Sequence, residues 1–148
     1  MKIVIQCCAT KAKARRSFKI EGHQVKFVAD PERFAADSEN SEGFVGFRPD
    51  DLMPSSSITW REHLLAYNDR GDNSDGLLQA GSLYKPPAYQ NLRNRAGAEN
   101  LYILSAGWGL VRSDFLLPDY DITFSSQAKQ RWKRRMRCDE YRDLAHLT

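Results

Sequence analysis

Two short apolar runs, far apart along the chain, carry the strongest structural signal of the sequence. Residues 2–6 (KIVIQ) and Leu101–Ser105 (LYILS) are rich in large apolar side chains and lack regular polar alternation. Runs of this kind are typical of strands that are buried on both faces, as in the centre of a parallel sheet. We therefore expect the two runs to lie side by side as central parallel strands of a mixed sheet.

Other segments predict a hairpin and helices around these strands. Residues 17–28 alternate apolar and polar side chains on both sides of a glycine, which predicts an N-terminal β-hairpin. Thr59 and Glu62 have the spacing of a capping box, in which each side chain bonds the other residue's backbone amide, and predict a helix over residues 60–68. Residues 84–97 begin near two prolines and end in glycine, as a helix often does. The predicted fold class is α/β with flanking helices.

The length of the chain indicates how it is organised. The 148 residues suffice for one domain with its own core, and we expect a single domain over residues 1–148. Residues 30–57 are acidic and rich in Ser, Pro and Gly, which predicts an irregular surface excursion with one helical turn near residues 32–36. Residues 125–147 predict a basic C-terminal helical segment. The final AHLT has no polar tail, which is compatible with a longer parent chain.

Composition argues against several classes of protein. The chain is 41% apolar and 28% charged, and no apolar stretch approaches the roughly 18–20 residues of a membrane span. The N-terminal run is too short for a secretion signal, so we expect a cytoplasmic protein without a membrane partner. An odd number of cysteines (Cys7, Cys8 and Cys138) indicates reduced thiols. These cysteines and the three histidines lack metal-ligand spacing, and we expect neither a metal nor another cofactor.

Charge is distributed unevenly along the chain. Residues 1–26 contain seven Lys and Arg residues against one acid, whereas residues 30–75 contain four against eleven acids. A basic run near the C-terminal end contains Lys129, Arg131, Lys133, Arg134, Arg135 and Arg137. On a helix, these side chains can lie along the phosphates of DNA or RNA with an affinity that falls with salt. They can equally pair with the acidic middle of the chain, and both interpretations stay open.

Small and polar residues follow both predicted central strands. The first strand is followed by Cys8, Thr10 and Lys11, and the second ends in Ser105 and is followed by Gly107, Trp108 and Gly109. Adjacent parallel strands would bring both loops to the carboxyl edge of the sheet, where open α/β sheets bind ligands. Glycines let backbone amides approach a ligand, and the indole of Trp108 can stack on a base or sugar. The alternative is that Trp108 anchors the core and the glycines form a tight turn.

Two carboxylates flank a phenol shortly after these strands, in the stretch Asp119, Tyr120 and Asp121. In an extended segment, residues two apart share a face, so both acids can point into the same crevice. Together with the phenol, they can divide acid, base and hydroxyl-binding roles. The alternative is a solvated loop whose carboxylates only cap local turns.

Four motifs, taken in order, resemble a known family. They are IVIQCCATK at residues 3–11, QAGSLYKPPAY at residues 79–89, YILSAGWGLV at residues 102–111 and PDYD at residues 118–121. These stretches resemble the bacterial and phage domains related to the peroxide-stress protein YaaA. The resemblance implies an α/β fold like that of uracil-DNA glycosylases and a setting in nucleic-acid chemistry. Carried over by position, it implies a pocket lined by Cys8, Thr10, Lys11, Ser105, Gly109, Tyr120 and Asp121.

These features support three hypotheses of function. The first is an enzyme that cleaves or exchanges a nucleobase, with catalytic residues Asp121, Tyr120 and Ser105 and a substrate site formed by Cys8, Thr10, Lys11, Gly107, Trp108 and Gly109. The second is a stress or defence protein that binds DNA or RNA without catalysis through Arg134, Arg135 and Arg137. The third is a protein-interaction module whose basic helix binds an acidic partner, such as a protein from the same operon.

Overall fold

A three-stranded mixed sheet brings the two apolar runs of the sequence together in the structure, a computed structural model that describes residues 1–125 and 127–136. Strand β1 (Ile3–Gln6) pairs in parallel with β6 (Leu101–Ser105), and β6 pairs antiparallel with β7 (Gly109–Arg112). The expected parallel pairing is therefore present. Because the strand order is β1-β6-β7, only β6 is central, and Val4 on the edge strand is 58% exposed.

A second mixed sheet is built around β3 (His23–Val28). Strand β2 (Lys19–Ile20) pairs antiparallel with the start of β3, which confirms the predicted hairpin. Strand β4 (Phe44–Phe47) lies parallel along one edge of β3, and β9 (Tyr120–Asp121) lies parallel along the other edge, beyond β2. The residues of β9 are thus held in a sheet rather than in a solvated loop.

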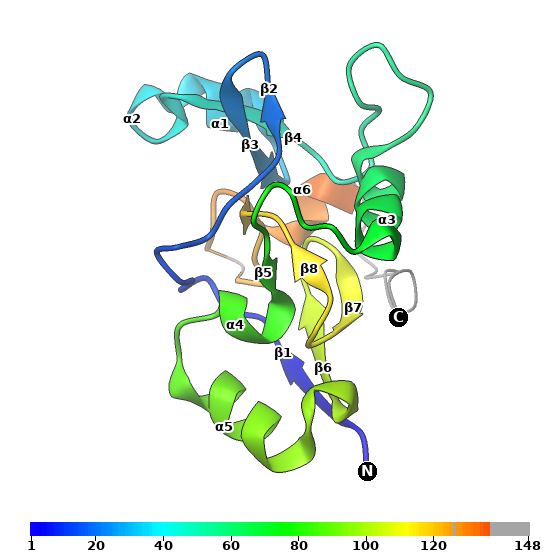
Figure 1. Cartoon of the computed structure of the whole chain (residues 1–148). Coiled ribbons are helices and arrows are strands. Elements are labelled where there is room, and N and C mark those ends of the chain that lie inside the picture. The colour runs from blue at the N-terminus through cyan, green and yellow to red at the C-terminus, as the bar shows by residue number, and fades with distance from the viewer. Residues whose placement is uncertain (126, 137–148) are drawn as a thin grey trace.

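A small antiparallel pair and several short helices complete the fold (Figure 1). The pair consists of β5 (Leu78–Gln79) and β8 (Leu116–Leu117). The helices are α1 (Pro31–Ala36), α2 (Ser38–Ser41), α3 (Trp60–Arg70), α4 (Ala80–Leu83), α5 (Pro87–Ala96), the 3-10 turn η1 (Ala98–Asn100) and α6 (Trp132–Met136). None of the helices in the described residues is long and apolar enough to cross a membrane.

The architecture is mixed α/β, as expected, but differs from the prediction in three places. The strands divide among three sheets instead of forming one. Residues 30–57 contain α1, α2 and β4 rather than only one helical turn. Helix α6 begins at Trp132, so the helical segment expected over residues 125–147 is wrong for residues 125 and 127–131. Residues 126 and 137–147 of that segment lie outside the described residues.

Aromatic side chains connect the second sheet to α3 and to the β6–β7 turn. The ring of Phe18 stacks on that of Trp60, with their centroids 5.9 Å apart. Phe27 contacts Trp108 edge to face at 4.9 Å, and Tyr67 meets Phe18 at 5.2 Å. All five side chains are buried. Burial of each large apolar side chain stabilises the fold by about 1.5–3 kcal/mol relative to leaving it exposed.

The capping box predicted for α3 is formed in full. The Thr59 hydroxyl accepts a bond from the Glu62 amide at 3.1 Å, and the Glu62 carboxylate accepts one from the Thr59 amide at 3.0 Å. At the other end, Gly71 adopts a left-handed conformation with φ of 73°, and its amide bonds the carbonyl of Tyr67. These two ends explain why the helix spans Trp60–Arg70, slightly longer than predicted.

Thr59→Ala is expected to lower the free energy of unfolding by about 1 kcal/mol, because the Glu62 amide loses its acceptor. Urea denaturation followed by far-UV circular dichroism measures the change. Thr59→Ser keeps the hydroxyl and should retain most of the stability, and Ser57→Ala, at an exposed neighbour, serves as the control. Equal stability of the Thr59→Ala and Ser57→Ala variants would show that the box contributes nothing.

Candidate functional site

A buried hydroxyl network joins the two mixed sheets. Ser105 at the end of β6 donates a hydrogen bond from Oγ to the hydroxyl of Tyr120 in β9 at 2.9 Å. The hydroxyls of Tyr120 and Tyr84 are hydrogen-bonded to each other as well. Burial raises the pKa of both phenols well above the usual range. Both tyrosines are therefore neutral at physiological pH.

Because successive side chains of a strand point to opposite faces, the neighbours of Tyr120 face away from this network. Asp119 accepts a bond from Arg15 Nε and another from Lys26 Nζ, each at 2.7 Å, and its side chain is only 6% exposed. The side chain of Asp121 is exposed and makes neither a hydrogen bond nor an ion pair within residues 1–125 and 127–136. As far as the described residues show, Asp119 has two cationic partners and the carboxylate of Asp121 has none that would keep it from a ligand.

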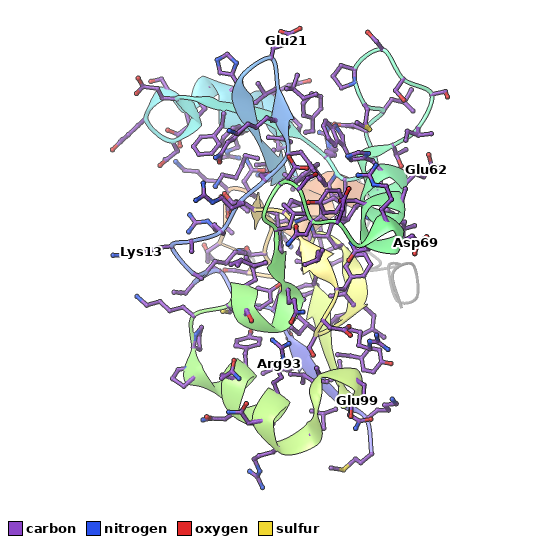
Figure 2. All side chains as sticks on the ribbon, in the orientation of Figure 1. Lys13, Glu21, Glu62, Asp69, Arg93 and Glu99 are labelled. Carbon is purple, nitrogen blue, oxygen red and sulfur yellow. The ribbon has the colours of Figure 1, made fainter. Side chains whose placement is uncertain are left out.

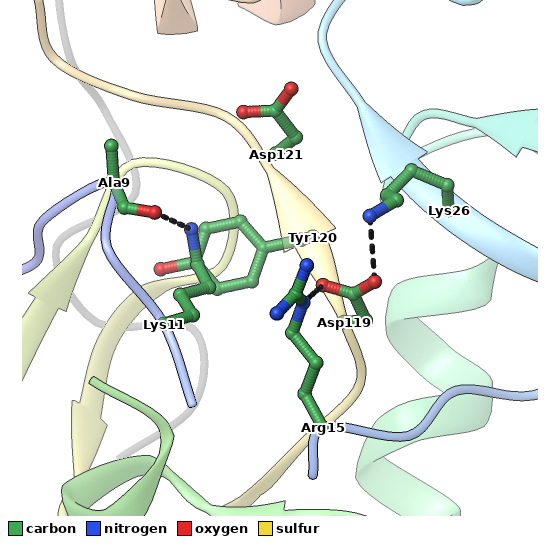
Figure 3. Close-up of a pocket in the computed structure, with 7 residues that line it drawn as sticks. All are labelled: Ala9, Lys11, Arg15, Lys26, Asp119, Tyr120 and Asp121. Atoms are coloured by element: carbon green, nitrogen blue, oxygen red, sulfur yellow. Dashed lines mark hydrogen bonds and ion pairs between the residues drawn. The ribbon is translucent and has the colours of Figure 1, made fainter. Parts of the chain in front are cut away.

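Both carboxylates border a cavity of about 280 Å³ (Figure 3). Its lining residues are Ala9, Lys11, Arg15, Lys26, Asp119, Tyr120 and Asp121. The amine of Lys11 lies 4.5 Å from the centre of the Tyr120 ring and donates to the carbonyl of Ala9 at 3.5 Å. Burial lowers the pKa of Lys11, and nearby acidic groups, Asp121 among them, oppose this shift. The cavity thus holds three cationic side chains against two carboxylates.

A second cavity of about 320 Å³ shares Ala9 with the first. Its lining residues are Gln6, Cys7, Cys8, Ala9, Thr123, Phe124 and Ser125. The sulfur of Cys7 accepts a bond from the amide of Ala106, and the Cys8 thiol donates to the carbonyl of Thr10. Burial raises the pKa of Cys7, which keeps its thiol protonated and a poor nucleophile.

The structure brings together part of the predicted site. Lys11, Asp121 and the ring of Tyr120 line the first cavity, and Cys8 lines the second. Thr10 lines neither of these two cavities, and its carbonyl accepts a bond from the amide of Lys85 at 3.1 Å. Ser105 is fully buried. The expectation that Ser105 and the Tyr120 hydroxyl contact a substrate is therefore corrected, since both groups are held inside the network.

The Gly107–Trp108–Gly109 stretch forms the turn of the β6–β7 hairpin, in which Ser105 pairs with Gly109. Trp108 is fully buried, so its ring offers no exposed face for a base, and the core interpretation replaces the stacking one. Gly109 has φ of 88°, which a side chain would strain. A Cβ at Gly107 would lie 3.0 Å from the Tyr120 ring. These glycines shape the support of the site instead of lining it.

Several residues of the site were not singled out from the sequence. Arg15 and Lys26 reach the first cavity, and the only sequence signal for them was the excess of basic residues in residues 1–26. The buried guanidinium of Arg61 donates to the carbonyl of Trp108 at 2.9 Å and to Asp50 at 2.7 Å. Arg61 thus holds the hairpin turn against α3, a role that local sequence pattern does not reveal.

The basic residues near the C-terminal end pair partly with the acidic middle of the chain. Lys129 lies 3.7 Å from a carboxylate oxygen of Asp37, and Arg134 lies 3.4 Å from one of Asp30. These contacts favour the interpretation of internal neutralisation for the two residues. Of the other predicted contacts, Arg131 and Lys133 are half-buried. The side chain of Arg135 and the whole of Arg137 lie outside the described part of the chain.

Comparison with protein-family models, curated proteins and solved structures finds no match to this chain. The function is therefore argued from the geometry of the cavities. Among the described residues, no group of three or more His, Cys, Asp and Glu side chains is placed to hold a metal ion.

Ser105→Ala is expected to lower the free energy of unfolding by roughly 1–3 kcal/mol, because buried groups lose a hydrogen-bond partner. The groups affected are the Tyr120 hydroxyl and the amides of Gly107 and Trp108, which bond Ser105 Oγ at 3.2 and 3.1 Å. Urea denaturation measures the loss against Ser74→Ala, at an exposed position. Equal stability of the two variants would contradict a supporting role for Ser105.

Proposed function

We propose that this chain is an enzyme that acts on a nucleobase or nucleoside unit of DNA or RNA at the cavity between Lys11 and Asp121. The observation that supports this most is the carboxylate of Asp121, which has no partner within the described residues and lies beside three cationic side chains in one cavity. A nucleotide unit presents the matching groups, which are an anionic phosphate and a sugar carbon that becomes positively charged when the base leaves.

The cationic side chains supply the phosphate contacts in this proposal. The negative charge of Asp119 is neutralised by its ion pairs with Arg15 and Lys26. The same pairs hold the N–H donors of both basic side chains at the cavity wall. Lys11 has no carboxylate at ion-pair distance among the described residues. Charge-assisted bonds from ammonium and guanidinium groups to phosphate oxygens are short and strong. A bound phosphate would therefore find donors that need little rearrangement.

Asp121 supplies the chemistry at the sugar. Cleavage of a glycosidic bond passes through an oxocarbenium-like state, which a nearby carboxylate stabilises, attacks or relieves by activating water. Asp121 sits in β9, whose position is fixed by the inward-pointing Tyr120. The reaction class is base release or base exchange. The resemblance of the sequence to YaaA-like domains agrees with this setting and is part of the same proposal.

The second candidate is nucleic-acid binding without catalysis. It is favoured by the excess of cationic groups in the cavity and by the burial of Ser105 and the Tyr120 hydroxyl, which leaves Asp121 without a catalytic partner hydroxyl. In this case, Asp121 would repel phosphate rather than act on the sugar. The two candidates predict opposite effects of the same substitution.

Asp121→Asn is expected to reduce base release by at least about a hundredfold while binding is retained or strengthened, because the amide cannot act as a base but removes a negative charge. DNA and RNA oligonucleotides with ordinary and modified bases are incubated with the protein, and free base is measured by mass spectrometry. Binding is measured in parallel by titration at several salt concentrations.

Asp69→Asn is the matched control, since Asp69 is an exposed aspartate on α3, on the other side of the molecule from Lys13 in Figure 2. It should leave both base release and binding unchanged. Salt-dependent binding with no base release from any substrate would overturn the enzymatic proposal and support the second candidate.

A further inference from the structure

Lys11 has the surroundings of a nucleophilic amine rather than those of an ordinary surface lysine. It is half-buried in the cavity wall and lies over the face of Tyr120 at 4.5 Å. Its one hydrogen bond to a described residue is a long contact of 3.5 Å with the Ala9 carbonyl. A desolvated lysine beside other cationic groups is the usual setting for an amine that forms a covalent intermediate with a carbonyl compound.

The other basic groups of the cavity do not meet these conditions. The amine of Lys26 is fixed by its 2.7 Å ion pair with Asp119, so its donors already point to that carboxylate. Arg15 carries a guanidinium, which does not lose its proton in proteins and is bound to the same carboxylate. Lys11 is thus the only basic group among the residues that line this cavity with an amine free to react.

We propose that Lys11 forms a Schiff base with the aldehyde carbon of a phosphate-bearing sugar, such as the ring-opened C1′ of a sugar that has lost its base. The phosphate would contact Arg15 and Lys26 while the aldehyde faces Lys11. This inference rests on the proposed function in one respect, because base release at Asp121 would create such an aldehyde in the same cavity.

The step balances without an oxidant or a further reactant. The lone pair of the neutral Lys11 nitrogen adds to the carbonyl carbon, and the carbonyl electron pair moves to oxygen, which takes a proton to give a carbinolamine. The nitrogen then gives up a proton, the carbinolamine hydroxyl takes up a proton and leaves as water, and the nitrogen lone pair forms the carbon–nitrogen double bond of the protonated Schiff base. Asp121, in the same cavity, is placed to accept and return these protons.

The reaction is expected to persist to a lower pH than at an ordinary lysine. Burial lowers the pKa of Lys11, so a larger share of its amine is neutral near pH 7. Among the described residues, the ionisable groups near its amine are Cys7, Cys8, Asp119, Tyr120, Asp121, Arg15 and Lys26. As pH falls through the lowered pKa, the amine gains its proton and adduct formation should decline.

The test is reductive trapping with sodium borohydride, which converts a Schiff base into a stable amine. The whole chain is mixed in one arm with an oligonucleotide that contains a preformed base-free site, and in the other with free pentose 5-phosphate. Intact-mass analysis detects the adduct and peptide mapping locates it. Reaction in the first arm identifies a nucleic-acid source of the aldehyde, and reaction in the second alone identifies a small metabolite.

Lys11→Arg keeps the charge but cannot form the adduct, and the adduct should be lost. Lys13→Arg is the matched control, because Lys13 is an exposed lysine of the same loop, labelled in Figure 2, and it should react like the unchanged chain. Circular dichroism checks the fold of each variant. Lys11→Met, which keeps the length of the stem without a charge, replaces the arginine variant if that one fails to fold.

Absence of an adduct, or an equal adduct with Lys11→Arg, overturns the inference. Base release that depends on Asp121 but gives no trapped adduct leaves the proposed function standing and removes the role of Lys11. Adduct formation on the preformed aldehyde without base release from any intact strand supports the amine chemistry and removes the glycosidic proposal. The two hypotheses therefore fail separately.

Discussion

The hydrogen bonds around Tyr120 are the contacts on which the arrangement of the candidate site depends. They join Ser105 of the first sheet, Tyr120 of the second and Tyr84 next to α4 in one buried cluster. Buried hydroxyl groups are costly to leave unpaired, so each member fixes the direction of the others. Because Tyr120 points into this cluster, the alternation of the extended chain turns Asp119 and Asp121 away from it and toward the first cavity, where Asp119 is buried by its two ion pairs and Asp121 is exposed.

The cavity that results assigns different roles to two acids of similar sequence context. Asp119 forms ion pairs with Arg15 and Lys26, and its pair with Arg15 holds the loop after β1 against β9. Asp121 is left exposed beside Lys11. Partly buried ion pairs of this kind contribute more to geometry than to net stability, since the attraction between the charges is offset by their loss of water.

Local patterns predicted local structure well. The hairpin of residues 17–28, the capping box at Thr59 and the pairing of the two apolar runs followed from periodicity and spacing. Strand β4 was missed because its four residues include a glycine within an acidic stretch, and its place depends on close packing of Phe34 at Gly46, where a Cβ would lie 2.8 Å from the ring. The burial of Trp108 and the ion pairs of Asp119 depend on contacts between residues far apart in the sequence, so residue spacing could not predict them.

Ala9 is the one residue that lines both of the cavities beside the loop after β1. Its methyl group is the smallest side chain that a chiral residue can place between them. The space above this position therefore depends on the size of one side chain. A larger residue at position 9 would narrow both cavities. Under the proposed function, the size of the side chain at position 9 would limit how thick a substrate can be without changing the charge of either cavity.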